Sequence, residues 1–190
     1  MKQIFLAGEG RTELGGWSFA RPYRSPTPEI AVLEALLRRV VPSGWVIKDA
    51  IVWKDIPKAK PGDFRKPETR NVLGAALKAR ESHCDVLVFS RDRDRGEARE
   101  HAIEAAIKEI SANQTMKVAG GVAIEEIESW VLSCRGHAGA EGLRDAKAAA
   151  AKDLFGKTLV EHLQDFNPDD LTADASSLRR WIDRVRKALS

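Results

Sequence analysis

Cysteine and long hydrophobic runs are scarce in this chain of 190 residues. Its two cysteines, Cys84 and Cys134, are too few for a disulfide framework or for a zinc site of four cysteines. No stretch approaches the roughly 20 apolar residues that a membrane-spanning helix needs. The opening segment, MKQIFLAGEGRTE, becomes polar too soon for a signal peptide. We therefore expect a soluble cytoplasmic protein that does not contact a membrane.

A large excess of one charge is also missing, because 31 basic and 28 acidic residues leave a net charge of only +3. This balance excludes a histone-like polycation, so the distribution of charge is more informative than its sum. Residues 54–70 carry six basic and three acidic side chains, whereas Glu125–Glu128 contains three carboxylates and no base. Separate basic and acidic surfaces are typical of a protein that holds a metal and a polyanion together, although ordinary solvated helix faces give the same pattern.

Apolar periodicity predicts strands that alternate with helices. This alternation indicates an α/β fold with a mostly parallel sheet, helices on both faces and further helices at the C-terminus. Two long loops, rich in proline, are expected at residues 10–28 and 54–67. We expect residues 1–135 to form the α/β domain and residues 136–190 a helical extension packed on it. The expected strands are 3–8, 45–53, 85–90 and 116–124, and the expected helices are 28–40, 68–82, 97–111, 125–134, 144–155 and 178–189.

Acidic groups follow three of the expected strands. Glu9 follows the first strand, Asp92 and Asp94 follow the buried strand DVLVFS, and Glu125, Glu126 and Glu128 follow the last strand. In open α/β sheets, ligands bind at the carboxyl ends of the strands. If the strands are parallel, these carboxylates converge on one edge of the sheet.

Each acidic group has a chemical and a purely structural interpretation. In an extended chain, Asp92 and Asp94 point to the same side and can bind a hard divalent cation such as Mg²⁺. Alternatively, these aspartates form ion pairs with neighbouring arginines. Glu9, between two glycines, is suited to general acid–base chemistry beside a metal, or is an ordinary polar strand end. The last cluster either surrounds a cation or forms a solvated first helical turn.

The order of these motifs resembles the Toprim domain. The resemblance is carried by the signature Glu9-Gly10-Arg11-Thr12-Glu13, by Asp92-x-Asp94 and by the segment Ile127–Leu132, which is similar to small stand-alone Toprim-like proteins of prokaryotes. It covers about residues 1–135. It implies a compact α/β sheet and Mg²⁺- or Mn²⁺-dependent cleavage of phosphodiesters in DNA or RNA, with roles in phage defence or repair.

The resemblance also implies roles for individual residues. Glu9, Asp92 and Asp94 match the catalytic and metal-binding acids, Glu128 matches a further metal ligand of the stand-alone group, and Glu13 matches the second acid of the signature. Glu125 and Glu126 are additional acidic candidates. From charge alone, we expect phosphates to contact basic residues of the long loop and of the strand ends, namely Arg11, Lys58, Lys60, Arg65, Lys66, Arg91 and Arg93.

Two functions remain open. The first is a metal-dependent nuclease. The second is a non-catalytic module that binds nucleic acid or a partner protein, such as an ATPase encoded nearby. The second is favoured by two departures from the family pattern: residues 15–28 are rich in glycine and proline where the family enters a helix, and Ser133 and Cys134 stand where an aspartate is common. The only tyrosine, Tyr23, lies in this loop, which disfavours a topoisomerase-type mechanism.

Overall fold

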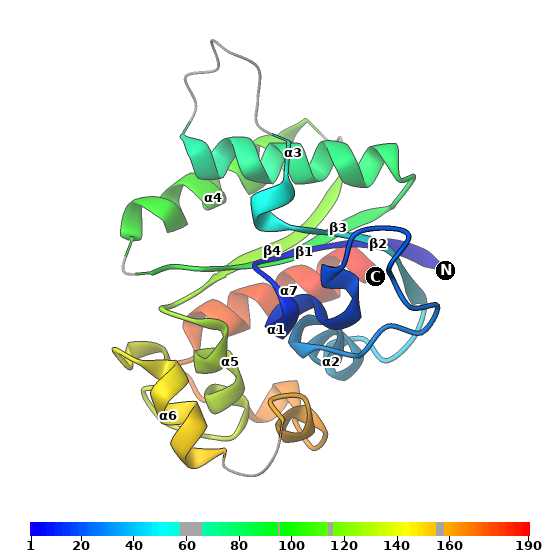
Figure 1. Ribbon diagram of the computed structural model, residues 1–190. Coiled ribbons are helices and arrows are strands. Elements are labelled where there is room, and N and C mark those ends of the chain that lie inside the picture. Colours follow the sequence, from blue (N-terminus) through cyan, green and yellow to red (C-terminus); the bar gives the residue numbers. More distant parts are fainter. Residues whose placement is uncertain (58–65, 95, 114–115, 155–157) are drawn as a thin grey trace.

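The computed structural model describes residues 1–57, 66–94, 96–113, 116–154 and 158–190. In this part of the chain the fold is α/β, as predicted, with an all-parallel sheet covered by helices on both faces (Figure 1). None of the described helices is long and apolar enough to cross a membrane. The strands are β1 (Lys2–Gly8), β2 (Trp45–Val52), β3 (Val86–Asp92) and β4 (Lys117–Ala123). The α-helices are α1 (Arg11–Leu14), α2 (Val32–Val40), α3 (Pro67–Glu81), α4 (Glu97–Ala112), α5 (Ile127–Cys134), α6 (Ala146–Asp153) and α7 (Ser176–Leu189).

The strands have the order β2-β1-β3-β4, so β1 and β3 are central. Both central strands are almost continuously apolar because each of their faces is buried. Successive side chains enter opposite cores, since a strand alternates its faces. Ile4 and Val88 belong to the core on the side of α2, α5 and α7, whereas Phe5 and Phe89 belong to the core under α3 and α4.

Helix α7 is an integral part of one core. Its apolar residues recur at helical spacing, and Leu178, Trp181, Ile182 and Val185 are all at most 2% exposed. The indole Nε1 of Trp181 also donates a hydrogen bond to the backbone oxygen of Phe89 at 3.1 Å. The C-terminal helix is therefore fixed directly to the central strand β3.

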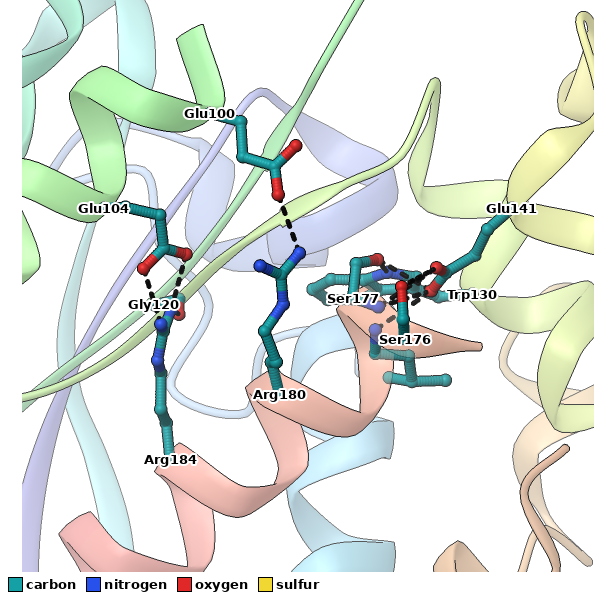
Figure 2. A network of polar contacts seen from close by, with 10 residues as sticks. Glu100, Glu104, Gly120, Trp130, Glu141, Ser176, Ser177, Arg180 and Arg184 are labelled. Atoms are coloured by element: carbon teal, nitrogen blue, oxygen red, sulfur yellow. Dashed lines mark hydrogen bonds and ion pairs between the residues drawn. The ribbon is translucent and has the colours of Figure 1, made fainter. Parts of the chain in front are cut away.

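The first turn of α7 receives an unusual cap from a distant carboxylate. Glu141, in the 3₁₀ helix η3 (Ala140–Gly142), accepts hydrogen bonds from the backbone N–H groups of Ser177 and Leu178 at 3.0–3.1 Å (Figure 2). It also accepts one from the Ser177 hydroxyl at 2.7 Å, and that hydroxyl accepts one from Trp130 Nε1. Glu141 thereby satisfies N–H groups that the helix itself leaves unpaired.

Two segments differ from the sequence-based expectation. The helix predicted to begin at the Thr27-Pro28-Glu29 cap begins at Val32 instead, because the backbone oxygen of Glu29 accepts a hydrogen bond from Gly16 at 3.2 Å and Ala31 is extended. The loop predicted over residues 10–28 contains α1 and a 3₁₀ helix, Gly15–Ser18. The short helix α1 lies mostly within the Glu9–Glu13 signature, and the segment that follows it over residues 15–28 contains only the 3₁₀ helix Gly15–Ser18, so the expected departure from the family pattern is present.

Candidate functional site

The chain order of the strands places a crevice between β1 and β3. From β1 the chain moves to β2 on one side, and then returns to place β3 and β4 on the other side. The carboxyl ends of β1 and β3 thus form a topological switch point, where open α/β sheets bind their ligands. Glu9 directly follows β1, and Asp92 is the last residue of β3.

A cavity of about 220 Å³ lies at this point, and carboxylates dominate its lining. They come from β1 and α1, from the end of β3, and from the start of α5. Only two basic residues, Arg11 and Lys147, line the cavity within the described part of the chain. The lining carboxylates are Glu9, Glu13, Asp92, Glu126 and Glu128.

Asp92 is the central acid of this group. Burial raises its pKa from an ordinary 3.8 to about 7, and the negative charges of Glu13, Glu128 and Asp94 act in the same direction. A hydrogen bond with the backbone of Ile127 opposes the rise in pKa. Asp92 is therefore held where its ionised form is unfavourable unless a positive charge accompanies it.

Glu13 and Glu128 are buried next to it, at 5% and 9% exposure. Burial raises the pKa of both carboxyl groups, and the positive charge of Lys147 works against that rise. Glu13 also accepts a hydrogen bond from the backbone N–H of Gly10 at 2.9 Å, which closes the first turn of α1. The same side chain therefore stabilises a helix end and adds negative charge to the cavity.

Glu9 lies at the rim of the cavity and pairs with an arginine of the same chain. Its Oε1 atom forms an ion pair with Arg91 and accepts a hydrogen bond from the backbone N–H of Asp92 at 3.1 Å. Arg91 is itself enclosed, since its guanidinium lies 5.7 Å from the ring of Trp53 and 3.6 Å from Glu68. These contacts fix Glu9 against the end of β3.

Asp94 and Glu125 do not line the cavity. Asp94 has a left-handed backbone with φ of 46°, so the extended geometry expected across Asp92–Asp94 is absent, and its carboxylate pairs with Arg99. Glu125 pairs with Arg93 at 2.7 Å. The structural alternative, in which arginines neutralise the acids of this region, thus describes Glu9, Asp94 and Glu125. Asp92 and Glu128 form no ion pair with any described residue.

The predicted phosphate-binding residues differ in their exposure. Arg11 is 69% exposed and pairs with Glu29, and Lys66 is exposed at the start of α3. Arg91 and Arg93 are mostly enclosed by their ion pairs. Lys58, Lys60 and Arg65 lie outside the described residues.

Two residues of the site were not predicted from the sequence. Lys147 lies in the alanine-rich helix α6, where an exposed lysine resembles ordinary surface charge. Glu68, at the start of α3, pairs with Arg91 and Arg99 and accepts a hydrogen bond from Trp53 Nε1 at 3.1 Å. No local motif marks either residue, because each reaches the site only through the packing of helices.

The donor chemistry fits a hard divalent cation such as Mg²⁺, which prefers carboxylate oxygens. Asp92 and Glu128 supply buried negative charge, and Glu13 lies near enough to affect both of their pKa values. Among the described residues, however, no three carboxylate, histidine or cysteine side chains are already gathered as metal ligands. The Oε2 atom of Glu13 accepts the hydrogen bond from Gly10, so a cation that took this atom as a ligand would displace that hydrogen bond.

Comparison of the chain with models of protein families, with curated proteins and with solved structures gives no match.

Proposed function

We propose that Asp92, Glu13 and Glu128 bind Mg²⁺ or Mn²⁺, and that the protein hydrolyses phosphodiester bonds in DNA or RNA. The observation that carries this proposal is the convergence of carboxylates from three strand ends on one cavity at the switch point. Buried like charges repel one another, and a divalent cation removes that repulsion. Asp94 is left out of the ligand set, because Arg99 holds it away from the cavity.

Glu9 is the proposed proton acceptor. Its Oε1 is engaged by Arg91 and by the N–H of Asp92, and no described residue donates a hydrogen bond to its Oε2. Oε2 is therefore the atom that would take a proton from an attacking water and later return it to the leaving oxygen. A bound cation would supply polarisation of the phosphoryl oxygen and a lower pKa for the water.

The resemblance to Toprim proteins supports the same chemistry, because Glu9 and Asp92 stand at the ends of neighbouring parallel strands. A cytoplasmic nuclease of prokaryotic defence or repair, working with a partner ATPase, is the corresponding biological proposal.

A second candidate is a non-catalytic module that binds nucleic acid or a partner protein. It is favoured by the ion pairs that already neutralise the rim, between Glu9 and Arg91, Asp94 and Arg99, and Glu125 and Arg93. In this function the carboxylates position arginines, and binding is independent of metal.

Mn²⁺ titration together with DNA and RNA cleavage assays separates the two functions. For Asp92→Asn we expect at least about tenfold weaker Mn²⁺ binding and loss of cleavage, because a central ligand is removed. Asp94→Asn is the matched control, and it should retain Mn²⁺ affinity and most activity. Cleavage that survives both Asp92→Asn and Glu9→Gln would reject the assigned centre. Nucleic-acid binding without any Mn²⁺ binding by the unaltered protein would favour the non-catalytic module.

A further inference from the structure

We infer that Lys147 forms a phosphate-binding subsite at the rim of the acidic cavity, an inference that rests on the proposed function. Lys147 lines the cavity together with Asp92, Glu13 and Glu128. Its ligand class is the phosphodiester backbone of a nucleic acid.

The first turn of α6 is firmly held over the cavity. Ala146 and Ala150 are at most 3% exposed, and α6 lies beside α5 (Figure 1). Asp145 caps the helix by accepting a hydrogen bond from the N–H of Ala148 at 2.8 Å. The backbone N–H of Lys147 donates to Glu126 Oε2 at 2.9 Å, and Glu126 immediately precedes α5. The backbone of Lys147 is therefore held in place, although its side chain is exposed.

The ammonium group of Lys147 is available to a ligand. It forms no ion pair within the described chain, whereas Arg11, the other basic residue of the lining, is paired with Glu29 at 2.8 Å. Arg91 and Arg93 are similarly engaged by Glu9 and Glu125. Among the described basic residues named here, Lys147 can thus meet a phosphate without breaking an existing ion pair.

The positive charge of Lys147 can interact either with the carboxylates of the cavity or with a bound phosphate. Without a cation, Lys147 is attracted to Glu13 and Glu128, which it partly neutralises. A divalent cation bound by those carboxylates would take over that role and would repel the ammonium group. The flexible lysine stem then lets the ammonium group move outward to a non-bridging phosphate oxygen. Lys147 should therefore favour nucleic-acid binding and oppose metal binding.

With this assignment, the segment after residue 135 contributes a residue, Lys147, to the proposed substrate-binding site. The resemblance to Toprim proteins extends only to about residue 135, whereas Lys147 comes from beyond it. The C-terminal segment would then complete the substrate-binding surface in addition to covering the sheet.

The test compares Lys147→Gln with Lys152→Gln, a matched control on the same helix whose exposed lysine does not line the cavity. Binding of short fluorescein-labelled DNA and RNA strands is followed by anisotropy in Ca²⁺, and Mn²⁺ affinity is titrated separately. For Lys147→Gln we expect roughly tenfold weaker nucleic-acid binding, with the salt slope reduced by about one. Mn²⁺ should bind as tightly or more tightly, and Lys147→Arg should restore nucleic-acid affinity.

Unchanged nucleic-acid affinity in Lys147→Gln, or an equal loss in Lys152→Gln, would overturn the subsite while leaving the metal centre intact. Weaker Mn²⁺ binding in Lys147→Gln would also contradict it, because the ammonium group would then be supporting the metal ligands. Absence of Mn²⁺ binding in the unaltered protein would instead count against the proposed function itself.

Discussion

The carboxyl group of Asp92 shares a confined space with Glu13 and Glu128 at the end of β3, and its ionisation is correspondingly unfavourable. In the unfolded chain this group ionises near its ordinary pKa of 3.8, whereas in the folded protein its pKa is about 7. Between these values the folded state holds a proton that the unfolded state releases. The contribution of Asp92 to stability is therefore full below about pH 4 and declines as the pH rises to about 7.

Replacement of Asp92 by asparagine should remove this dependence. Asparagine keeps the size and an oxygen acceptor for Ile127, and it carries no charge. In metal-free buffer at pH 8 we expect Asp92→Asn to be more stable than the unaltered protein by on the order of 2 kcal/mol, and the difference should vanish near pH 4. Urea unfolding at a series of pH values measures this difference. Asp94→Asn, at an exposed side chain, serves as the control, and an equal gain there would contradict the assignment.

At the residue scale, every carboxylate that lines the cavity was a candidate from the sequence, whereas Asp94 does not line the cavity and the basic residue Lys147 was not predicted. Glu9 and Asp92 meet because the ends of parallel strands β1 and β3 are adjacent. Asp94 was expected beside Asp92, but the left-handed turn and its pair with Arg99 direct it elsewhere. Lys147 could not be predicted, because only the packing of α6 brings it to the cavity.

Among the elements, α7 depends most clearly on a single distant side chain. Glu141 accepts hydrogen bonds from two backbone N–H groups at its start, in a buried setting where water cannot replace them (Figure 2). We expect Glu141→Gln to lower the free energy of unfolding by about 1–3 kcal/mol, because an amide offers only one accepting oxygen and introduces unpaired donors.

Thermal or urea unfolding checks this prediction against Glu81→Gln, whose carboxylate forms only an exposed pair with Lys78 and should change stability by under about 1 kcal/mol. Equal stability of the Glu141→Gln and Glu81→Gln variants would show that the cap is unimportant for α7.

The elements themselves were mostly predictable, because their apolar spacing is strong. The run at 85–90 predicts a buried strand, and the stripe from Leu178 to Leu189 predicts a helix, and both are present as β3 and α7. The start of α2 was predicted wrongly. The capping signal at Thr27 depends only on neighbouring residues and takes no account of tertiary contacts. A tertiary hydrogen bond between Gly16 and Glu29 holds that segment outside the helix.

At the scale of the whole molecule, an arginine donates a hydrogen bond to one backbone carbonyl on each edge strand of the sheet. Arg24 donates to the backbone oxygen of Ala50 on β2, and Arg184 donates to that of Gly120 on β4 at 2.8 Å (Figure 2). Each guanidinium is held by a carboxylate, Asp49 for Arg24 and Glu104 for Arg184. Unprotected edge strands pair readily with other chains, so these contacts are expected to keep molecules apart.

Arg184→Ala should therefore increase self-association, measured by analytical ultracentrifugation over a range of concentrations. Arg180→Ala is the matched control, because Arg180 also pairs with a glutamate of α4 but, within the described residues, donates no hydrogen bond to a strand carbonyl (Figure 2). If both variants sediment like the unaltered protein, Arg184 does not protect the edge.

The central claim is that carboxylates far apart in the sequence bind one cation at the switch point between β1 and β3. The most direct measurement is an anomalous difference map from a crystal soaked in Mn²⁺. We predict a peak bounded by Asp92, Glu13 and Glu128, with Glu13 released from Gly10. A map without a peak in this cavity, with Glu13 still bonded to Gly10, would contradict the claim.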